Sequence, residues 1–411
     1  MNFKQRRNKL IDSLNQNSIT VVFSGTSIPH SEDENYPFDV NRNFYYLTGL
    51  DRENMILLLS NIGGNYQQLL FIEPYDEFLA KWVGGRISSE EASSISGIKS
   101  VREIQSFDAV FGSLISRNRG LNKINLYLDM WHYSVGDTAT KALEFAKKIR
   151  NEYPAIHIND LFKNITSLRM IKDNDEVNAI IRANEITNNG ILAMMSYSKA
   201  GIYERELEKV FDLELAKQGC GQNAFPTIAA GGMNATTLHY SENKSKLLDG
   251  DLFLTDLGSA YNYYCSDVSR TFPVNGKFSN RQKEIYNVVL NGQKLVQSKA
   301  RPGISTRQLN NILIEYYKVE LPKINLNKPV SEYYFHGVSH QLGLDTHDVT
   351  LDYQAPLVAG NVISNEPGLY ITDEGIGIRI EDDLLITEDG CKNLSSMIIK
   401  EISDIEKHMN K

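Results

Sequence analysis

Short apolar runs and amphipathic stretches alternate along the first 160 residues. Runs of apolar, β-branched or aromatic residues bounded by turn residues predict strands over 18–25, 43–50, 54–61, 67–74 and 124–130. Helical spacing of apolar residues predicts helices over 3–16 and 138–150. Strands mixed with helices in this way favour a compact α/β unit.

A polar stretch separates this unit from the rest of the chain. Residues 159–176 are polar, so we place a domain boundary there and expect domains 1–165 and 166–411. Asp173 begins the sequence D-N-D-E and is followed three residues later by Glu176, which is typical of a capping box. A long helix is therefore expected to begin at this point.

The second half mixes long helical periods with strands that glycine residues interrupt. Helices are expected after Asp173 to about residue 195, and over 203–219, 279–299 and 305–320. Strands are expected over 250–258, 263–272, 361–371 and 376–387. This mixture favours the α+β class for the second domain.

Composition narrows the class of protein. The 411 residues favour two domains, and the 41% apolar and 23% charged content is near the globular average. The net charge of −8 argues against a nucleic acid as partner, since such binders need a basic surface. No apolar run approaches the length of about 18 residues that spans a membrane, so no membrane partner is expected.

Cysteine usage and the N-terminus bear on the compartment. Cys220, Cys265 and Cys391 are scattered and form no C-x-x-C pair, which argues against a disulfide framework or a cysteine zinc site. The first fourteen residues lack the apolar core of a signal peptide. We therefore predict a cytoplasmic protein.

Two aspartates lie where a strand turns back on itself. Asp256 stands in the apolar sequence LFLTDLGSA, and Asp267 follows in CSDVSRTF. A strand, a tight turn and a returning strand would bring the two carboxylates together, and they would repel unless one took a proton or a cation lay between them. Alternatively, Asp267 pairs with Arg270 and Asp256 caps a turn.

Two glutamates follow in strand-like sequence. Glu366 precedes Pro367, which favours extended backbone. Glu381 follows an alternating run in which Arg379 and Glu381 point to the same side. An ordinary surface salt bridge between these two side chains is the alternative.

Histidines concentrate in the same half of the chain. His239 stands alone, whereas His336, His340 and His347 fall within HGVSHQLGLDTHD at 336–348. A polar loop is the alternative to a functional role. Together with the carboxylates, these imidazoles predict a site for two divalent ions, with hard oxygen donors that suit Mn²⁺, Co²⁺, Fe²⁺ or Zn²⁺. The chemistry predicted from the residues is metal-assisted hydrolysis.

The order and spacing of these motifs resemble a known family. TLHYSEN, LFLTDLG, CSDVSRTFPVNGKF, HGVSHQLGLDTHD, NEPGLY and GIRIEDD resemble the aminopeptidase P family of pita-bread metallopeptidases over residues 170–405. NRNFYYLTGL and the W-x-G-x-R run at 82–86 also resemble its N-terminal domain. The resemblance implies two domains, an N-terminal creatinase-like α/β domain and a C-terminal pita-bread domain. For Trp82 it suggests a role near the substrate, with plain packing as the alternative.

The resemblance also implies which residues bind metal. Asp256, Asp267, His340, Glu366 and Glu381 match the family's ligands, with Asp267 and Glu381 bridging both ions. Glu366 would also carry the proton released by the bridging water. Two divalent ions per subunit are expected, with Mn²⁺ as the expected metal.

Other residues match positions that contact the substrate. His239 and His347 match histidines that bind the substrate and stabilise the tetrahedral intermediate, and are therefore also catalytic candidates. His336 and Arg379 match residues near the penultimate proline and the metal cluster, and Tyr370 is a possible hydrogen-bond donor there.

The function implied is release of the N-terminal residue from peptides whose second residue is proline, by hydroxide bridging two divalent ions. The partners expected are such peptides and a second or further copies of the chain, as a homodimer or homotetramer. A prolidase that hydrolyses Xaa-Pro dipeptides is the main alternative. A metal-free relative such as creatinase, or an inactive binding module, would predict lost ligand carboxylates, which this sequence retains.

Overall fold

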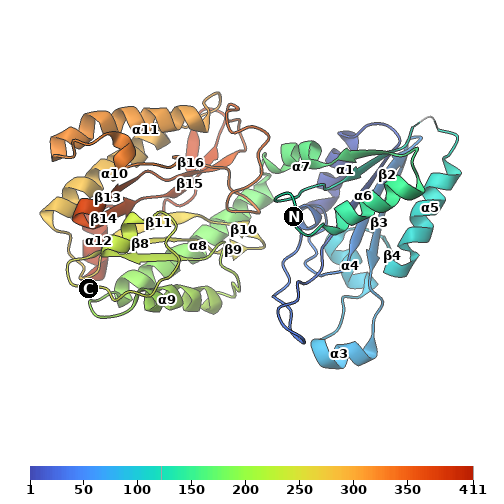
Figure 1. Cartoon of the computed structure of the whole chain (residues 1–411), viewed down its shortest axis with the longest axis horizontal. Coiled ribbons are helices and arrows are strands. Elements are labelled where there is room, and N and C mark those ends of the chain that lie inside the picture. The colour runs from blue at the N-terminus through green and yellow to red at the C-terminus, as the bar shows by residue number, and fades with distance from the viewer. Residues whose placement is uncertain (122, 411) are drawn as a thin grey trace. The chain divides into compact units, whose positions relative to one another are not determined.

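The computed structural model describes residues 1–121 and 123–410, and the chain divides into two compact units, Met1–Leu168 and Arg169–Lys411 (Figure 1). The sequence placed this division at 165/166. The stretch around it, predicted as a polar connection, contains β6 (His157–Asp160) and α7 (Phe162–Arg169), the latter running across the division. No helix in the described part of the chain is long and apolar enough to cross a membrane.

A mixed sheet forms the centre of the first unit. Its strands, in the spatial order β4-β3-β2-β1-β5-β6, are β1 (Ser18–Phe23), β2 (Ile56–Ile62), β3 (Asn65–Ile72), β4 (Ser100–Glu103), β5 (Asn125–Leu128) and β6. Strand β2 pairs antiparallel with β1 and with β3, and the outer pairings are parallel. The α/β character predicted for this unit is therefore observed.

This unit also contains helices, of which α5 (Phe107–Arg117) and α6 (Lys141–Glu152) pack against the sheet. The others are α1 (Phe3–Asp12), α2 (Arg42–Thr48), α3 (Glu77–Val83), α4 (Ser89–Ser96), the 3-10 helix η1 (Ile104–Ser106) and α7. Phe107, Phe111 and Phe145 from α5 and α6 pack edge-on and tilted against one another in the core.

Residues 43–50, predicted as a strand, form helix α2 instead. The side chain of Asn41 accepts a hydrogen bond from the backbone N–H of Phe44, which caps the helix N-terminus. Gly49 ends the helix in the left-handed conformation with φ 71°, as glycine does at helix C-termini. These two caps outweigh the strand preference of Phe44, Tyr45 and Tyr46.

The second unit places strands between two pairs of helices. Helices α8 (Asn174–Tyr197) and α9 (Glu204–Lys217) pack together, as do α10 (Asn280–Lys299) and α11 (Thr306–Glu320), and α12 (Ile402–Met409) lies near α8 (Figure 1). The capping box of Asp173 and Glu176 is confirmed at the start of α8. Short 3-10 helices are η2 (Gly232–Thr236), η3 (Leu321–Ile324), η4 (Val330–Glu332) and η5 (Thr372–Glu374).

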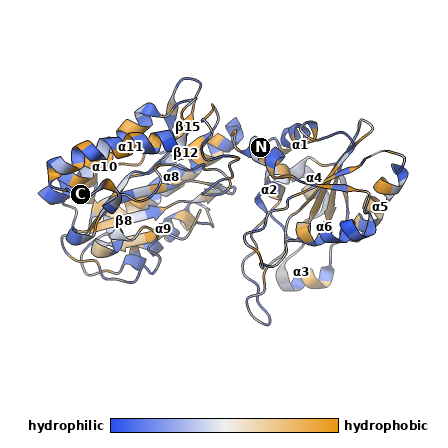
Figure 2. Ribbon diagram, turned by 45° about the horizontal axis from the view of Figure 1, so that its top comes forward, coloured by the Kyte–Doolittle hydropathy of each residue, from blue (hydrophilic) through white to orange (hydrophobic). Residues whose placement is uncertain are grey.

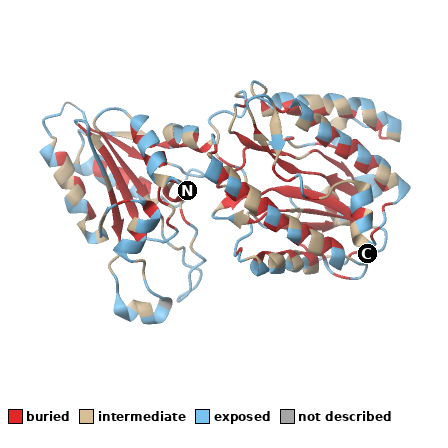
Figure 3. Ribbon diagram, turned by 180° about the vertical axis from the view of Figure 1, so that it is seen from behind, coloured by how far each residue is buried: buried red, intermediate tan, exposed pale blue. Residues whose placement is uncertain are grey.

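Small antiparallel sheets make up the interior of this unit. The strands are β7 (Ile228–Gly231), β8 (Leu252–Leu257), β9 (Ala260–Tyr261), β10 (Tyr264–Cys265), β11 (Val268–Pro273), β12 (Val362–Asn365), β13 (Gly368–Ile371), β14 (Ile376–Arg379), β15 (Asp382–Ile386) and β16 (Cys391–Asn393). The sheets run β11-β8-β7, β12-β15-β16, β13-β14 and β10-β9. In both units the strands are mostly apolar and buried, and the helices expose their polar sides (Figures 2 and 3).

Three predicted strands are each interrupted once, and the first of them, 263–272, breaks at Ser266 and Asp267 between β10 and β11. The stretch 361–371 breaks at Glu366 and Pro367, and the stretch 376–387 breaks at Ile380 and Glu381. In each case the chain leaves one sheet and enters another, since β12 pairs with β15 whereas β13 pairs with β14. The two glutamates therefore lie at the junctions between sheets.

Candidate active site

A β-hairpin brings the two predicted aspartates together. Strands β8 and β11 pair antiparallel, with Asp256 opposite Ser269 and Leu257 opposite Val268, so Asp267 stands beside the end of β8. Asp267 is buried and Asp256 is half-buried. The alternative that Asp267 pairs with Arg270 is wrong, because the Arg270 guanidinium lies 2.7 Å from Asp382 on the other face of the strand.

Glu381 joins this pair from the end of β14. Its backbone N–H donates to the carbonyl of Ser269, and its carboxylate accepts a 2.8 Å hydrogen bond from the Ser269 hydroxyl. One ligand atom each from Asp267, His340 and Glu381 lies within 4.8 Å of the other two. Backbone pairing between strands thus fixes the positions of three carboxylates.

His340 and Glu366 complete the cluster from irregular segments. The Nε2 atom of His340 lies 3.3 Å from Asp267 Oδ2 and 3.5 Å from Glu366 Oε1. Its Nδ1 atom lies 3.0 Å from the carbonyl oxygen of Gln341, which favours the tautomer with the proton on Nδ1 and a lone pair on Nε2. Ser364 joins both segments, because its hydroxyl accepts from His340 N and donates to Glu366 Oε1 at 3.3 Å.

The carboxylates of the cluster repel one another, which favours a bound proton or a cation among them. Burial, reinforced by the Asp256 carboxylate, raises the pKa of Asp267 well above its usual range, and burial together with Asp267 does the same to the pKa of Glu381. Burial also raises the pKa of Glu366. Burial lowers the pKa of His340, but the carboxylates of Glu366 and Glu381 outweigh it and raise this pKa.

The donors present fit divalent metal ions. The Asp256 Oδ1 atom is buried and has no hydrogen-bond partner among the described residues, which is costly unless another ligand meets it. Carboxylate oxygens with one imidazole nitrogen are a donor set for Mn²⁺, Co²⁺, Fe²⁺ or Zn²⁺. The negative charge of the carboxylates and the unpaired Asp256 Oδ1 atom are therefore both consistent with a metal site here.

Arg379, Tyr370 and His336 form a chain of hydrogen bonds beside the cluster. Arg379 donates to Asp256 Oδ2 at 2.6 Å and to the Tyr370 hydroxyl at 2.9 Å. The Tyr370 oxygen lies 2.9 Å from His336 Nε2, and His336 Nδ1 lies 3.6 Å from Glu366 Oε2. Burial, with Arg379 nearby, lowers the pKa of His336 to about 3, so this ring is neutral. The alternative of an Arg379 to Glu381 surface pair is wrong, since both side chains are buried.

His239 and His347 differ from the rest because they are exposed. Both lie on irregular segments and line the same cavity as the carboxylates. The ring centroid of His347 is 4.2 Å from that of His340. Burial, with the neighbouring His340, lowers the pKa of His347, so a neutral ring that can donate one N–H is expected at neutral pH.

A cavity of about 560 Å³ opens onto these groups. It is lined by Phe225, Pro226, Ile228, Leu238, His239, Ser241, Asp256, Asp267, His336, Gly337, Ser339, His340, Thr346, His347, Glu366, Arg379 and Glu381. All nine residues predicted as metal ligands, catalytic groups or substrate contacts are therefore brought together at one cavity. The lining also includes an apolar patch, which we define as Phe225, Pro226, Ile228 and Leu238.

Sequence profiles of known families agree with this geometry. The profile of metallopeptidase family M24 matches residues 178–388, and that of the aminopeptidase P N-terminal domain matches residues 3–123. The chain belongs to the aminopeptidase P group of metallopeptidase family M24. Members of this family are metal-dependent peptide hydrolases, and the two-domain pita-bread architecture predicted from the sequence is confirmed.

Similar proteins cover the whole of this M24 chain. The Xaa-Pro aminopeptidase of Haemophilus influenzae is 34% identical over 99% of this chain and 97% of its own length. A Bacillus anthracis protein solved as a candidate aminopeptidase P matches with a TM-score of 0.96 and 44% identity, covering 99% of this chain and 97% of that one. The zinc-substituted Escherichia coli aminopeptidase P, solved with product, matches with a TM-score of 0.91, 30% identity and the same coverage. The E. coli enzyme has also been solved with the inhibitor Pro-Leu.

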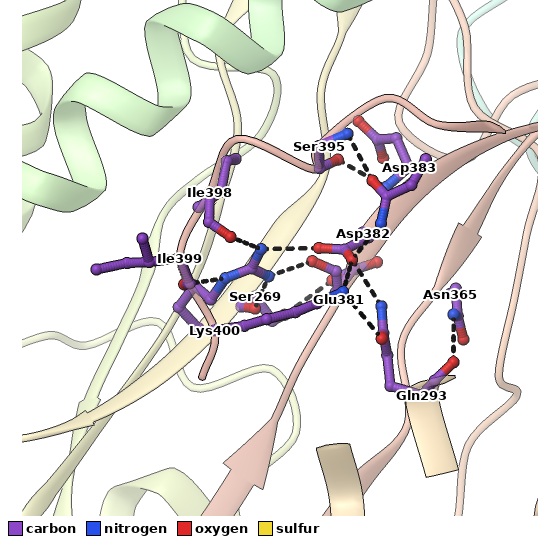
Figure 4. A network of polar contacts seen from close by, with 12 residues as sticks. Ser269, Gln293, Asn365, Glu381, Asp382, Asp383, Ser395, Ile398, Ile399 and Lys400 are labelled. Carbon is purple, nitrogen blue, oxygen red and sulfur yellow. Dashed lines mark hydrogen bonds and ion pairs between the residues drawn. The ribbon is translucent and has the colours of Figure 1, made fainter. Parts of the chain in front are cut away.

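A buried ionic network supports this M24 site from the far side of its strands (Figure 4). Asp382 accepts hydrogen bonds from Arg270, Gln293, Asn393 and Lys400. The Arg270 guanidinium also donates to the carbonyls of Ser269 and Glu381, and to those of the C-terminal segment at 398–399. Within β11, the Ser269 side chain contacts Glu381 on the ligand side, whereas the next residue, Arg270, belongs to this network.

Sequence reasoning missed the residues that hold the ligands. Ser269 lies two positions after Asp267, so strand alternation alone could have placed its hydroxyl on the ligand side. Asp383 accepts from Asn184 at 2.7 Å and from the backbone N–H of Asp267 at 3.3 Å, and no local pattern indicates this. Trp82, the uncertain candidate in the first unit, is 74% exposed and tilted against Phe78, so it is not a packed core residue of its own unit.

Proposed function

We propose that this protein releases the N-terminal residue from peptides with proline in the second position, using two divalent ions held by Asp256, Asp267, His340, Glu366 and Glu381. The observation that carries the proposal is the convergence of these five side chains on one cavity in a member of the aminopeptidase P group. Five ligands offer more donor oxygens than one ion needs, which supports two. Mn²⁺ is the metal we expect from the resemblance to the family, and the hard oxygen donors with a single nitrogen are compatible with it.

The shape of the cavity supports a short peptide as the substrate. Its volume of about 560 Å³ is in the range of small-ligand sites, and its apolar patch is suited to a proline ring. The E. coli relative binds the inhibitor Pro-Leu, which supports proline at this place. The proline nitrogen carries no N–H once in a peptide bond, so a site that accepts it cannot depend on that donor.

When bound, divalent ions lower the pKa of a water molecule and polarise the scissile carbonyl. The chain's own residues would do the rest. Asp256, with its unpaired Oδ1 atom, accepts from the free α-amine of the substrate and so positions the first peptide bond. His239 and His347 donate hydrogen bonds to the carbonyl oxygen as it becomes negative.

Glu366 is the proposed proton carrier. Its carboxylate lines the cavity with Oε1 3.5 Å from His340 Nε2, a position from which it can accept a proton from the attacking water and deliver it to the leaving proline nitrogen. His336 and Tyr370 hold Arg379 against Asp256, so the guanidinium keeps the ligand carboxylate oriented and borders the substrate. The neutral His336 adds no charge to this chain of hydrogen bonds.

The test is hydrolysis of a Xaa-Pro-Yaa tripeptide and of a Xaa-Pro dipeptide by chelator-treated protein, with and without added Mn²⁺. Metal-restored release of the first residue from the tripeptide is the expected result, and Glu381→Gln is the matched inactive control. Cleavage of the dipeptide alone would identify a prolidase instead. Cleavage of neither, with Mn²⁺, Co²⁺ or Zn²⁺, would contradict a catalytic function.

Two further properties belong to this proposal. A homodimer or homotetramer is expected, and sedimentation of the purified protein would distinguish the two. A cytoplasmic location is expected from the three scattered cysteines, none of which is paired in a disulfide in the described chain. Fractionation of cells that express the protein would test it.

A further inference from the structure

The segment that carries His347 has no regular secondary structure. Residues 343–347 form successive bends after the isolated bridge between Gln341 and Ile363. Two backbone hydrogen bonds fold the segment on itself, from Gly343 N to the Asp345 carbonyl at 3.1 Å and from Asp348 N to the Gln341 carbonyl at 2.9 Å. Strand pairing therefore does not fix the His347 ring, and something else must.

A buried ionic cluster binds the chain on both sides of His347 in the sequence. The Nη2 atom of Arg169 lies 2.7 Å from Asp345 Oδ2 and 2.5 Å from Asp348 Oδ1. Lys172 Nζ lies 3.0 Å from the second oxygen of Asp348. The side chains of Arg169, Lys172 and Asp348 are 3% exposed or less. One guanidinium thus joins the residues two before and one after the histidine.

The cationic segment is itself fixed to the body of the unit. The backbone N–H of Lys172 donates to the Gly360 carbonyl at 2.9 Å, and the Asn361 side chain donates to the Met170 carbonyl at 2.9 Å. Both partners immediately precede strand β12. The 169–172 segment therefore connects the bends at 343–347 to strand β12, which directly precedes Glu366.

Gly343 shows how closely the cluster is built. A Cβ atom added there would lie 2.1 Å from Asp348 Oδ2 and 3.0 Å from the Lys172 side chain. Only glycine leaves room for the carboxylate to reach both cations. Buried ion pairs are weak contributors to stability, because their desolvation offsets much of their attraction. We therefore look for a function of the Arg169–Lys172–Asp348 cluster other than stabilising the fold.

We propose that Asp348, held by Arg169 and Lys172, is a positioning residue that orients the His347 ring toward the reacting carbonyl. The inference rests on the proposed function, in which His347 donates to the developing oxyanion. A displacement of about 1 Å in such a donor costs on the order of a hundredfold in rate. Asp345 assists by holding the opposite side of the bend to the same guanidinium.

A double-mutant cycle tests the proposal. In the Mn²⁺-loaded enzyme, Asp348→Asn is expected to lower kcat/KM for the tripeptide by about 10- to 100-fold with metal content unchanged. In a His347→Ala background the same change is expected to have little further effect, because its target is already absent. Equal losses in both backgrounds would show a merely structural role and overturn the proposal.

A milder variant protects the test against misfolding. Asp348→Asn leaves buried cations without their carboxylate, whereas Asp345 has a side chain 39% exposed, so Asp345→Asn is expected to fold. It should lower kcat/KM several-fold, again only when His347 is present. Glu374→Gln, which weakens a comparable arginine pair with Arg281, is the control and should leave the activity unchanged.

A spectroscopic readout keeps this inference separate from the proposed function. In zinc-loaded protein with labelled histidine, the imidazole signals of His347, assigned by their loss in His347→Ala, should shift in Asp345→Asn. Those of His239 should not. An unshifted His347 signal would overturn the positioning role even if the enzyme is active. A shifted signal in a protein without peptidase activity would contradict the proposed function alone.

Discussion

The carboxylates around His340 and the two exposed histidines line one cavity, but the fold positions them differently. Asp256, Asp267 and Glu381 are placed by backbone pairing of β8, β11 and the start of β15. His239 and His347 stand on irregular segments that buried side chains hold in place. Strand register can fix several ligands at once, whereas a bend needs an anchor of its own.

The buried carboxylates of the metal cluster also differ from two other buried carboxylates in their ionisation. Burial and mutual repulsion raise the pKa values of Asp267 and Glu381, so in the metal-free chain these two carboxylates favour the protonated form. Burial opposes the ionised form of Asp348 and Asp382 too, but arginine and lysine partners lower both pKa values, that of Asp382 to about 2. Of these four buried carboxylates, Asp348 and Asp382 form ion pairs with arginine and lysine, whereas no arginine or lysine among the described residues lies at salt-bridge distance from Asp267 or Glu381.

The largest effect is expected from a strand-borne ligand. Asp267→Asn keeps the shape of the side chain but removes a charge beside His340 Nε2, so the metal centre should be lost. Because the metal supplies several kcal/mol of transition-state stabilisation, kcat/KM should fall by about a thousandfold or more. Metal content and tripeptide hydrolysis, measured together, check this. Activity near that of the unchanged enzyme would remove Asp267 from the ligand set.

A smaller loss is expected where the strand supports a ligand without being one. Ser269→Ala removes the hydroxyl that donates to Glu381 and accepts from Arg379. Metal affinity should weaken by about 10- to 100-fold, as for other residues that orient ligands. Titration of metal into the stripped protein measures it. Ser259→Ala, a buried serine that donates to the Ala183 carbonyl, is the control and should bind metal normally.

A change in the residues that support His239 or His347 should lower activity without loss of metal. Glu204 accepts hydrogen bonds from Gly231 N, Asn234, Tyr240 and Ser245 N, which fixes the segment that carries His239. Glu204→Gln replaces one of the two acceptor oxygens with an NH2 group that cannot accept, so kcat/KM should fall by about tenfold at unchanged metal content.

The matched control for this change lies two residues further along the same helix. Glu206 forms the capping box of α9 and is not among the partners of the His239 segment. Glutamine serves in capping boxes as glutamate does, so Glu206→Gln should retain full activity. Loss of metal in Glu204→Gln would contradict the separation between strand-borne and loop-borne groups.

The smallest effect concerns the stability of metal-stripped protein. Asp267 and Glu381 bind protons more tightly in the folded chain than their ordinary pKa values of 3.8 and 4.5 allow. They therefore favour folding at low pH, and the free energy of unfolding should fall as the pH rises from these values toward the raised ones. Denaturant titrations should show a shallower fall for Glu381→Gln. A slope equal to that of the unchanged protein would contradict the repulsion.

Local sequence signals predicted much of this arrangement. The capping box at Asp173, the hairpin that joins Asp256 and Asp267, and the alternation before Glu381 all depend on neighbours within a few residues. The resemblance of the motifs then indicated which side chains share the cavity. The strand predicted over residues 43–50 was wrong. The aromatic side chains there favour strands, but the caps at Asn41 and Gly49 favour a helix.

What the sequence did not predict depends on distant partners. Arg169 and Asp348 are separated by 179 positions, and Glu204 meets Ser245 across 41. Neither pair leaves a periodic signal. The breaks at Glu366 and Glu381 also depend on which sheet each half of the stretch joins, and a single sequence does not show sheet pairing.

The central claim is that the strand-borne cluster holds the metal and the exposed histidines act on the substrate. Titration of Mn²⁺ into stripped protein, with hydrolysis measured on the same samples, tests it most directly. Two ions per chain are predicted for the unchanged protein and for His347→Ala, with kcat/KM lowered, though still measurable, only in the latter. Fewer than two ions in the unchanged protein, or loss of metal from His347→Ala, would contradict the account.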